Sequence, residues 1–300
     1  MLNGYTGFAN MWEMDENNHL NVQFYMDWFH QSLDIIAIDL GHGPAMAQAQ
    51  QSQLRGVEDR ITYLREVRGA DTVVIKTMMV AVEEKALTLL HVMENDSTGE
   101  VAATNLQLVH LIGVDDFTPR PLSDDIREQA TKYLETPDAT LMPRHMDLLL
   151  DKVAPTTADA KKVGLFEAGR SVVQAQELDW TGRMRARFAL GRGSDSASLQ
   201  WKNVGIDVNH LDGNTGSVVM QTIMRHHNAP RLGTPVKAQA GLHALGNKTL
   251  QFAQWISDME TGEVYTTSDT IAVQFDQTAR KALPISDEQR AALSKNLLKI

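Results

Sequence analysis

Residues 15–29, DENNHLNVQFYMDWF, place a cluster of Asp, Asn and His side chains directly before a run of aromatic residues. Tyr25, Trp28 and Phe29 recur at steps of three and four. This spacing puts large apolar side chains on one face and predicts a mostly buried helix near residues 21–38. The sequence therefore places titratable groups at the start of a buried helix.

The chain contains one sequence unit twice. KALTLLHVMENDSTGEVAATNLQLV from Lys85 and KTLQFAQWISDMETGEVYTTSDTIAV from Lys248 share the frame K-x-L, alternation, T-G-E-V, alternation, at an offset of 163 residues. At an offset of 164 residues, Asp15 falls on Asp179. A second buried helix is therefore expected near residues 185–202.

The repeat predicts the domain organisation. We expect a first unit at residues 1–135, a connecting segment at 136–165 and a second unit at 166–300. After the helix, each unit has β-rich segments with apolar alternation, and turn residues separate them. The predicted fold class is α+β, with an antiparallel sheet wrapped around a long central helix in each unit.

A known motif matches the polar cluster. The pattern D-x-x-x-H-[VL]-N-x-x-x-Y resembles that of the hotdog-fold thioesterases of the 4-hydroxybenzoyl-CoA thioesterase type. The longer pattern D-x-N-x-H-x-N-x-x-x-Y-x-x-W is similar to that of the acyl-ACP thioesterases, which are tandem hotdogs of similar length. The matching positions are Asp15, Asn17, His19, Leu20, Asn21, Tyr25 and Trp28. The resemblance covers nearly the whole chain and implies a tandem hotdog protein that hydrolyses acyl thioesters.

The sequence departs from this pattern in three places. Asn18 replaces the usual Gly, and the second unit reads Asp179-x-x-Gly182-Arg183-Met184-Arg185. In the acyl-ACP enzymes the motif lies in the second unit, whereas here the complete motif lies in the first.

The position of the motif suggests its chemistry. The start of a buried helix offers unpaired N–H groups and partial positive charge, which can hold the oxyanion that develops on a thioester carbonyl. Asp15 is the candidate that activates water or attacks directly, and Asn17 and His19 are candidates to orient or shuttle protons. Backbone amides between Val22 and Tyr25 are the expected oxyanion donors.

Each of these residues also has a structural interpretation. Asp15 alternatively caps the helix, and His19 alternatively hydrogen-bonds a loop. Asn21 and Tyr25, taken as substrate-binding residues together with Val22, are also consistent with a purely structural role. Asp179 is either a second catalytic carboxylate or a cap.

The charges are unevenly distributed along the chain. Residues 1–165 hold 13 Lys and Arg and 25 Asp and Glu, a net charge of −12, whereas residues 166–300 have a net charge of +2. Arg183 and Arg185 begin a basic cluster at the second helix and are candidate ligands for the phosphates of CoA. Bridges to acidic groups or a solvated face are the alternative.

Composition excludes several classes of function. A net charge of −10 argues against nucleic acid and anionic membranes as partners, and the absence of Cys excludes disulfides and thiolate chemistry. The first residues have no signal-peptide pattern, so a soluble, cytoplasmic protein is expected. His226 and His227 lack further ligands at informative spacing, so neither a metal nor another cofactor is expected.

The predicted function is therefore hydrolysis of acyl-CoA to the free acid and CoA. Non-catalytic acyl-CoA binding is the alternative from another class, and acyl-ACP hydrolysis and hotdog enoyl-CoA hydration are enzymatic alternatives. The hydratase signature resembles D-x-N-P-[LIV]-H, from which this chain lacks the Pro and one residue of spacing. The acyl group, the number of catalytic units and a possible homo-oligomer are open at this point.

Overall fold

The computed structural model describes residues 1–206 and 215–300. The chain divides into two compact units, Met1–Arg144 and His145–Ile300. Each unit combines helices with one antiparallel sheet, so the predicted antiparallel sheets are confirmed.

The first unit has five long strands in the order β1-β3-β4-β5-β2, and the short β6 pairs with β5. These strands are β1 (Leu2–Phe8), β2 (Ser52–Tyr63), β3 (Thr72–Val82), β4 (Ala86–Asn95), β5 (Glu100–Gly113) and β6 (Pro119–Arg120). The helices are η1 (Met11–Glu13), α1 (Val22–Asp39), α2 (Pro44–Gln50), α3 (Asp124–Thr131) and η2 (Ala139–Leu141).

The second unit repeats this order as β7-β9-β10-β11-β8, and β12 pairs with β11. These strands are β7 (Phe166–Val172), β8 (Thr215–His226), β9 (Pro235–Leu245), β10 (Thr249–Asp258), β11 (Val264–Asp276) and β12 (Lys281–Ala282). The helices are η3 (Leu149–Asp151), α4 (Thr157–Val163), η4 (Ala175–Glu177), α5 (Ala186–Asp195), α6 (Ala197–Asn203), α7 (Asp287–Leu293) and η6 (Ser294–Asn296).

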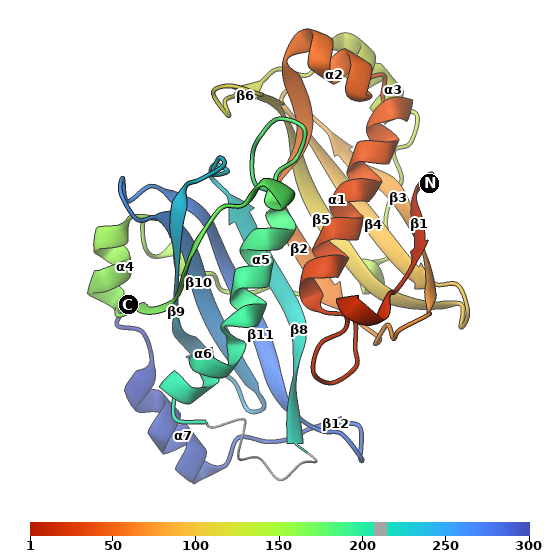
Figure 1. The fold of residues 1–300 in the computed structure, drawn as a ribbon. Helices are drawn as coiled ribbons and strands as arrows, with labels where there is room; N and C mark the ends of the chain where they lie inside the picture. Colours follow the sequence, from red (N-terminus) through yellow and green to blue (C-terminus); the bar gives the residue numbers. More distant parts are fainter. Residues whose placement is uncertain (207–214) are drawn as a thin grey trace. The chain divides into compact units, whose positions relative to one another are not determined.

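The helix α1 lies across one face of the first sheet (Figure 1). Its apolar face contributes Leu33 and Ile36 to a buried cluster with Leu54, Met79 and Val109 of the strands. The periodicity that predicts this helix is therefore the periodicity of its buried face.

The helical region of the second unit differs from our prediction. The single helix expected near residues 185–202 is divided into α5 and α6, which meet at Ser196. The segment before the break contains Gly193, Ser194 and Asp195, which are weak helix formers. A Cβ on Gly193 would also overlap the side chain of Gln254, so this position accepts only a glycine without local movement.

The segment predicted to connect the units packs on both of them. Leu141 and Met142 contact apolar residues of the first unit's sheet, away from the cluster that contains α1. Leu149, Val153 and α4 cover Trp255 of the second unit's sheet. In the described part of the chain, no helix has the length and apolar character that crossing a membrane requires.

Candidate active site

The Asp15 carboxylate closes the loop that leads into α1. Its Oδ1 accepts hydrogen bonds from the backbone N–H groups of Asn17 at 2.8 Å and His19 at 3.0 Å, and the Asp15 N–H donates to the His19 carbonyl at 2.7 Å. Asn18 adopts φ 58°, in the left-handed region where Gly is usual and Asn is tolerated. The loop is thus a tight turn built around one carboxylate oxygen.

The second oxygen of Asp15 has no hydrogen-bond partner within the described residues. The residue is half-buried, so the carboxylate is not enclosed in the core. The first oxygen satisfies the fold of the loop, and the second is available for chemistry.

Asn21, and not Asp15, caps α1. The Asn21 side chain accepts from Gln23 N–H at 3.1 Å, and its carbonyl accepts from Phe24 N–H at 2.9 Å. The structural alternative for Asp15, capping of the helix, is therefore wrong, because that role belongs to Asn21. Of the expected oxyanion donors, Val22 N–H has no hydrogen-bond partner within the described residues.

His19 lies beside a carboxylate that the motif does not contain. Its Nε2 is 3.2 Å from Glu66 Oε2, and Arg68 Nη2 donates to the same oxygen at 3.3 Å. Both residues belong to the loop after β2, whose Val67 carbonyl accepts from Leu20 N–H at 2.8 Å. Glu66 follows His19 by 47 residues, and no spacing pattern connects the two.

Tyr25 is held by this same loop. It is buried, its hydroxyl accepts from Val67 N–H at 3.3 Å, and its ring packs edge-on against Tyr63 at 5.1 Å between centroids. Burial raises the pKa of Tyr25, and a hydrogen bond from the Val67 backbone opposes this in part, so the phenol is neutral. These contacts give Tyr25 a structural role, and its contact with a substrate stays a prediction.

The second unit repeats the loop without the rest of the motif. Asp179 Oδ1 accepts from Thr181 N–H at 2.8 Å and Arg183 N–H at 3.3 Å, and Gly182 has φ 74° at the position of Asn18. The loop needs its Asp in both units for the same reason, so the presence of Asp179 does not require a catalytic role.

The candidate phosphate ligands have partners within the protein. Arg183 stands at the position of His19, is 6% exposed and donates to the Asn228 side chain at 3.0 Å and the Ala229 carbonyl at 3.1 Å. Arg185 replaces the capping Asn21, and its guanidinium lies 5.6 Å from the centre of the Phe188 ring. Phosphate binding by these arginines stays a prediction.

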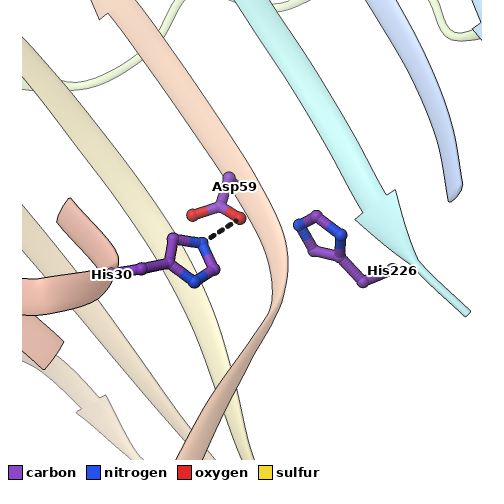
Figure 2. A group of neighbouring side chains, drawn as sticks. All are labelled: His30, Asp59 and His226. Carbon is purple, nitrogen blue, oxygen red and sulfur yellow. Dashed lines mark hydrogen bonds and ion pairs between the residues drawn. The ribbon is translucent and has the colours of Figure 1, made fainter. Parts of the chain in front are cut away.

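A buried polar network crosses the inner part of the first unit. His30 Nε2 of α1 contacts Asp59 Oδ2 of β2 at 3.0 Å, as Figure 2 shows. Asp59 Oδ1 accepts from the side chains of Asn105 at 2.7 Å and Gln107 at 2.8 Å, and Gln107 also bonds His91 at 3.2 Å.

Asp59 controls the charge of its neighbour. Burial lowers the pKa of His30, but the charge of Asp59 and its hydrogen bond more than offset this, so the pKa of His30 is raised above its ordinary value. The sequence offers no signal for the pair, because His30 and Asp59 are 29 positions apart.

Comparison with known proteins finds sequence similarity in the first unit. Residues 9–130, which contain the Asp15 loop and α1, match the thioesterase-like superfamily. A 121-residue stretch, 40% of this chain, is 25% identical to the L-carnitine dehydrogenase/betainyl-CoA thioesterase of Rhizobium meliloti (strain 1021). That stretch covers 24% of the relative, so the chain spans about a quarter of the length of this curated relative.

Solved structures share the fold at low sequence identity. A putative oleoyl thioesterase from Lactobacillus plantarum has a TM-score of 0.68 and 12% identity, with 91% of this chain and 96% of that chain covered. An acyl-ACP thioesterase from Bacteroides thetaiotaomicron has a TM-score of 0.65 and 12% identity, with 89% and 96% covered. The 12:0-ACP thioesterase from Umbellularia californica has a TM-score of 0.65 and 9% identity, with 90% and 93% covered. These structures show that the fold is that of the hotdog thioesterases, and the match to the thioesterase-like superfamily is confined to residues 9–130.

Proposed function

We propose that this chain, whose residues 9–130 match the thioesterase-like superfamily, is a tandem hotdog hydrolase of acyl-CoA thioesters with its reaction centre at the Asp15 loop. Each unit contributes one sheet and its helices, and the chemistry is carried by the first. The substrate is an acyl thioester of CoA, and the products are a carboxylic acid and CoA.

The observation that carries the proposal is that the two carboxylate oxygens of Asp15 differ in their hydrogen bonds. Oδ1 is fixed by the Asn17 and His19 N–H groups, while Oδ2 has no partner within the described residues. A carboxylate that is held rigidly by one oxygen presents the other in a defined direction. Such preorganisation is what a general base or nucleophile needs.

The start of α1 supplies the electrostatic complement. Val22 N–H, the first of the helix, carries the partial positive charge of the helix terminus and has no acceptor within the described residues. A thioester carbonyl whose oxygen meets this donor becomes more electrophilic, and the oxyanion that forms after attack is stabilised there. Asn21 fixes the donor by capping the same turn.

Two routes to the products use these atoms. In one, Asp15 takes a proton from water while the water oxygen attacks the carbonyl carbon, and the tetrahedral intermediate then expels the thiolate. In the other, Asp15 Oδ2 attacks, the thiolate leaves, and water hydrolyses the resulting anhydride. His19, paired with Glu66, is positioned to pass a proton to the leaving sulfur in either route.

The second unit has a structural role in this proposal. Its loop retains Asp179 for folding, but Arg183 stands where the first unit has His19, and a guanidinium does not exchange protons at neutral pH. The named activity of the Rhizobium meliloti relative, a betainyl-CoA thioesterase, supports CoA as the carrier.

A thiol-release assay tests the proposal. Wild-type protein is incubated with short, long, aromatic and cationic acyl-CoAs and with matched acyl-ACPs, and the released thiol is titrated. Cleavage of at least one acyl-CoA, with a rate above that of its acyl-ACP, is the expected result. Failure to cleave any thioester, together with a higher melting temperature in the presence of acyl-CoA, would replace the hydrolase with a binding module.

A further inference from the structure

Three large apolar side chains stand exposed beside the Asp15 loop. Phe8 is 57% exposed at the end of β1, and Met11 and Trp12 in η1 are 66% and 78% exposed. We call these three residues the Trp12 patch. A tryptophan this exposed is unusual in a soluble domain, and concentrated exposed apolar residues commonly mark a binding surface.

Hydrogen bonds hold the backbone under the Trp12 patch. Glu13 accepts from the Asn10 N–H at 2.7 Å, which closes a capping box around η1. Ala9 forms two backbone hydrogen bonds with the loop after β2. Its N–H donates to the Asp71 carbonyl at 2.9 Å, and its carbonyl accepts from the Ala70 N–H at 2.7 Å. The Trp12 side chain is therefore presented on a fixed turn, which reduces the entropy lost when a ligand binds.

The second unit has the same turn without the aromatic surface. The box recurs around η4, where Gln174 and Glu177 take the places of Asn10 and Glu13. At the offset of 164 residues, however, Phe8, Met11 and Trp12 are replaced by Val172, Ala175 and Gln176. The turn is thus shared, and an exposed aromatic side chain on the turn itself occurs in the unit with the complete motif and not at the matching position Gln176.

Exposed guanidinium groups lie on the loop that packs against this turn. The Arg65 side chain is 63% exposed and pairs with Glu100 at 3.5 Å, and the Arg68 side chain is 57% exposed and pairs with Glu66 at 3.3 Å. Each of these contacts uses one of the five N–H donors of a guanidinium group. The close approach of Met11 to Gly69 joins η1 to this loop, because a Cβ on Gly69 would overlap the Met11 sulfur. The exposed Trp12 ring and the guanidinium groups of this loop complement a purine nucleotide. Its base can stack on the ring, and its phosphates can accept hydrogen bonds from the guanidinium groups.

We infer that the Trp12 patch binds the nucleotide end of CoA, with the adenine stacked on Trp12 and the phosphates facing Arg65 and Arg68. This inference rests on the proposed function and names the part of the substrate that this surface recognises. Trp12 and Asp15 are three positions apart in the sequence, so their Cα atoms are at most about 11 Å apart. The flexible pantetheine arm of CoA links the two sites.

The test compares acyl-CoA with the matching acyl-pantetheine, which has the same thioester but lacks the nucleotide. Trp12→Ala should lower kcat/KM for acyl-CoA at least about fivefold, the lower end of the loss expected for one stacked base, and leave kcat/KM for acyl-pantetheine unchanged. Trp180→Ala, which removes a tryptophan that is 43% exposed in the Asp179 loop of the second unit, is the control and should change neither value.

Equal effects of Trp12→Ala on both substrates, or no effect on either, would overturn the inference. A change in oligomeric state of Trp12→Ala relative to the wild type on size-exclusion chromatography would also overturn it, because the patch would then be an interface between copies of the chain. If the wild type cleaves no thioester, the proposed function fails, and calorimetry with adenosine 3′,5′-bisphosphate then decides this inference. Binding to the wild type that weakens at least fivefold in Trp12→Ala supports it, and the absence of binding to the wild type refutes it.

Discussion

Acidification should destabilise the first unit through His91. This residue is fully buried on β4 between Thr77 and Gln107. A carboxylate only accepts hydrogen bonds, so Gln107 Nε2 donates to Asp59, and Gln107 Oε1 must accept from His91 Nε2. The Nδ1 of His91 then accepts from the Thr77 hydroxyl at 2.7 Å, and a second proton on the ring would require this hydroxyl to turn away and accept instead of donating.

The expected magnitude follows from the pKa of this histidine. Burial lowers the pKa of His91 from 6.5 to about 4, although the hydrogen bond to Gln107 and the charge of Asp59 act in the opposite direction. Between these two pH values the unfolded chain binds a proton that the folded chain does not, so stability is lost as the pH falls from 6.5 towards 4. The full effect is about 3 kcal/mol, reached near the lower value.

Urea denaturation of the wild type and His91→Gln at pH 7 and pH 4.5 measures this effect. The variant should be less stable at pH 7 by about 1–3 kcal/mol, because it disturbs buried hydrogen bonds. The difference in free energy of unfolding between the two proteins should be smaller by about 2–3 kcal/mol at pH 4.5, since the variant lacks the imidazole whose pKa burial lowers. Groups common to both proteins cancel in the comparison, and an equal difference at the two pH values would refute the reasoning.

Further substitutions examine the loops and the packing of β1. Asp179→Asn should leave turnover intact and change the melting temperature little, because Asn keeps an oxygen acceptor for the loop; loss of half the turnover would assign chemistry to the second unit. Asn21→Ala should lower the free energy of unfolding in urea by about 0.5–2 kcal/mol through loss of the cap, and Asn21→Asp should retain it; equal losses would contradict the capping role. Gly4→Ala should cost about 1–3 kcal/mol in the same assay because its Cβ would overlap Ser32 Oγ, whereas Gly169→Ala on β7 has nothing within 4 Å and should be neutral.

Features encoded by local spacing are predictable from this sequence. The apolar alternation on either side of T-G-E-V predicts two pairs of neighbouring strands, and these are β4 and β5 in the first unit and β10 and β11 in the second. Each pair is joined by a short turn. The helix expected near residues 21–38 spans Val22–Asp39, since its aromatic positions recur at helical steps and are buried. The polar residues before it form one loop, as their clustering in the sequence indicates.

Features that depend on long-range pairing are not visible in the sequence. Glu66 reaches His19 because the loop after β2 packs against the start of α1, and Asp59 meets His30 because α1 lies across the sheet. The break at Ser196 depends on helix propensity along a segment whose apolar pattern still suggests one helix. The different roles of the two Asp15 oxygens require coordinates, because a motif specifies residues and not the hydrogen bonds of their individual atoms.

The turnover of Asp15→Asn tests the central claim most directly. The substitution keeps an oxygen that can accept from the Asn17 and His19 N–H groups, and it removes the negative charge from the second position. Measured on the best acyl-CoA from the thiol-release panel, kcat should fall by on the order of 10²-fold or more, while the melting temperature and the affinity for CoA stay at wild-type values. A folded Asp15→Asn protein that cleaves acyl-CoA at the wild-type rate would contradict the assignment of the reaction to this carboxylate.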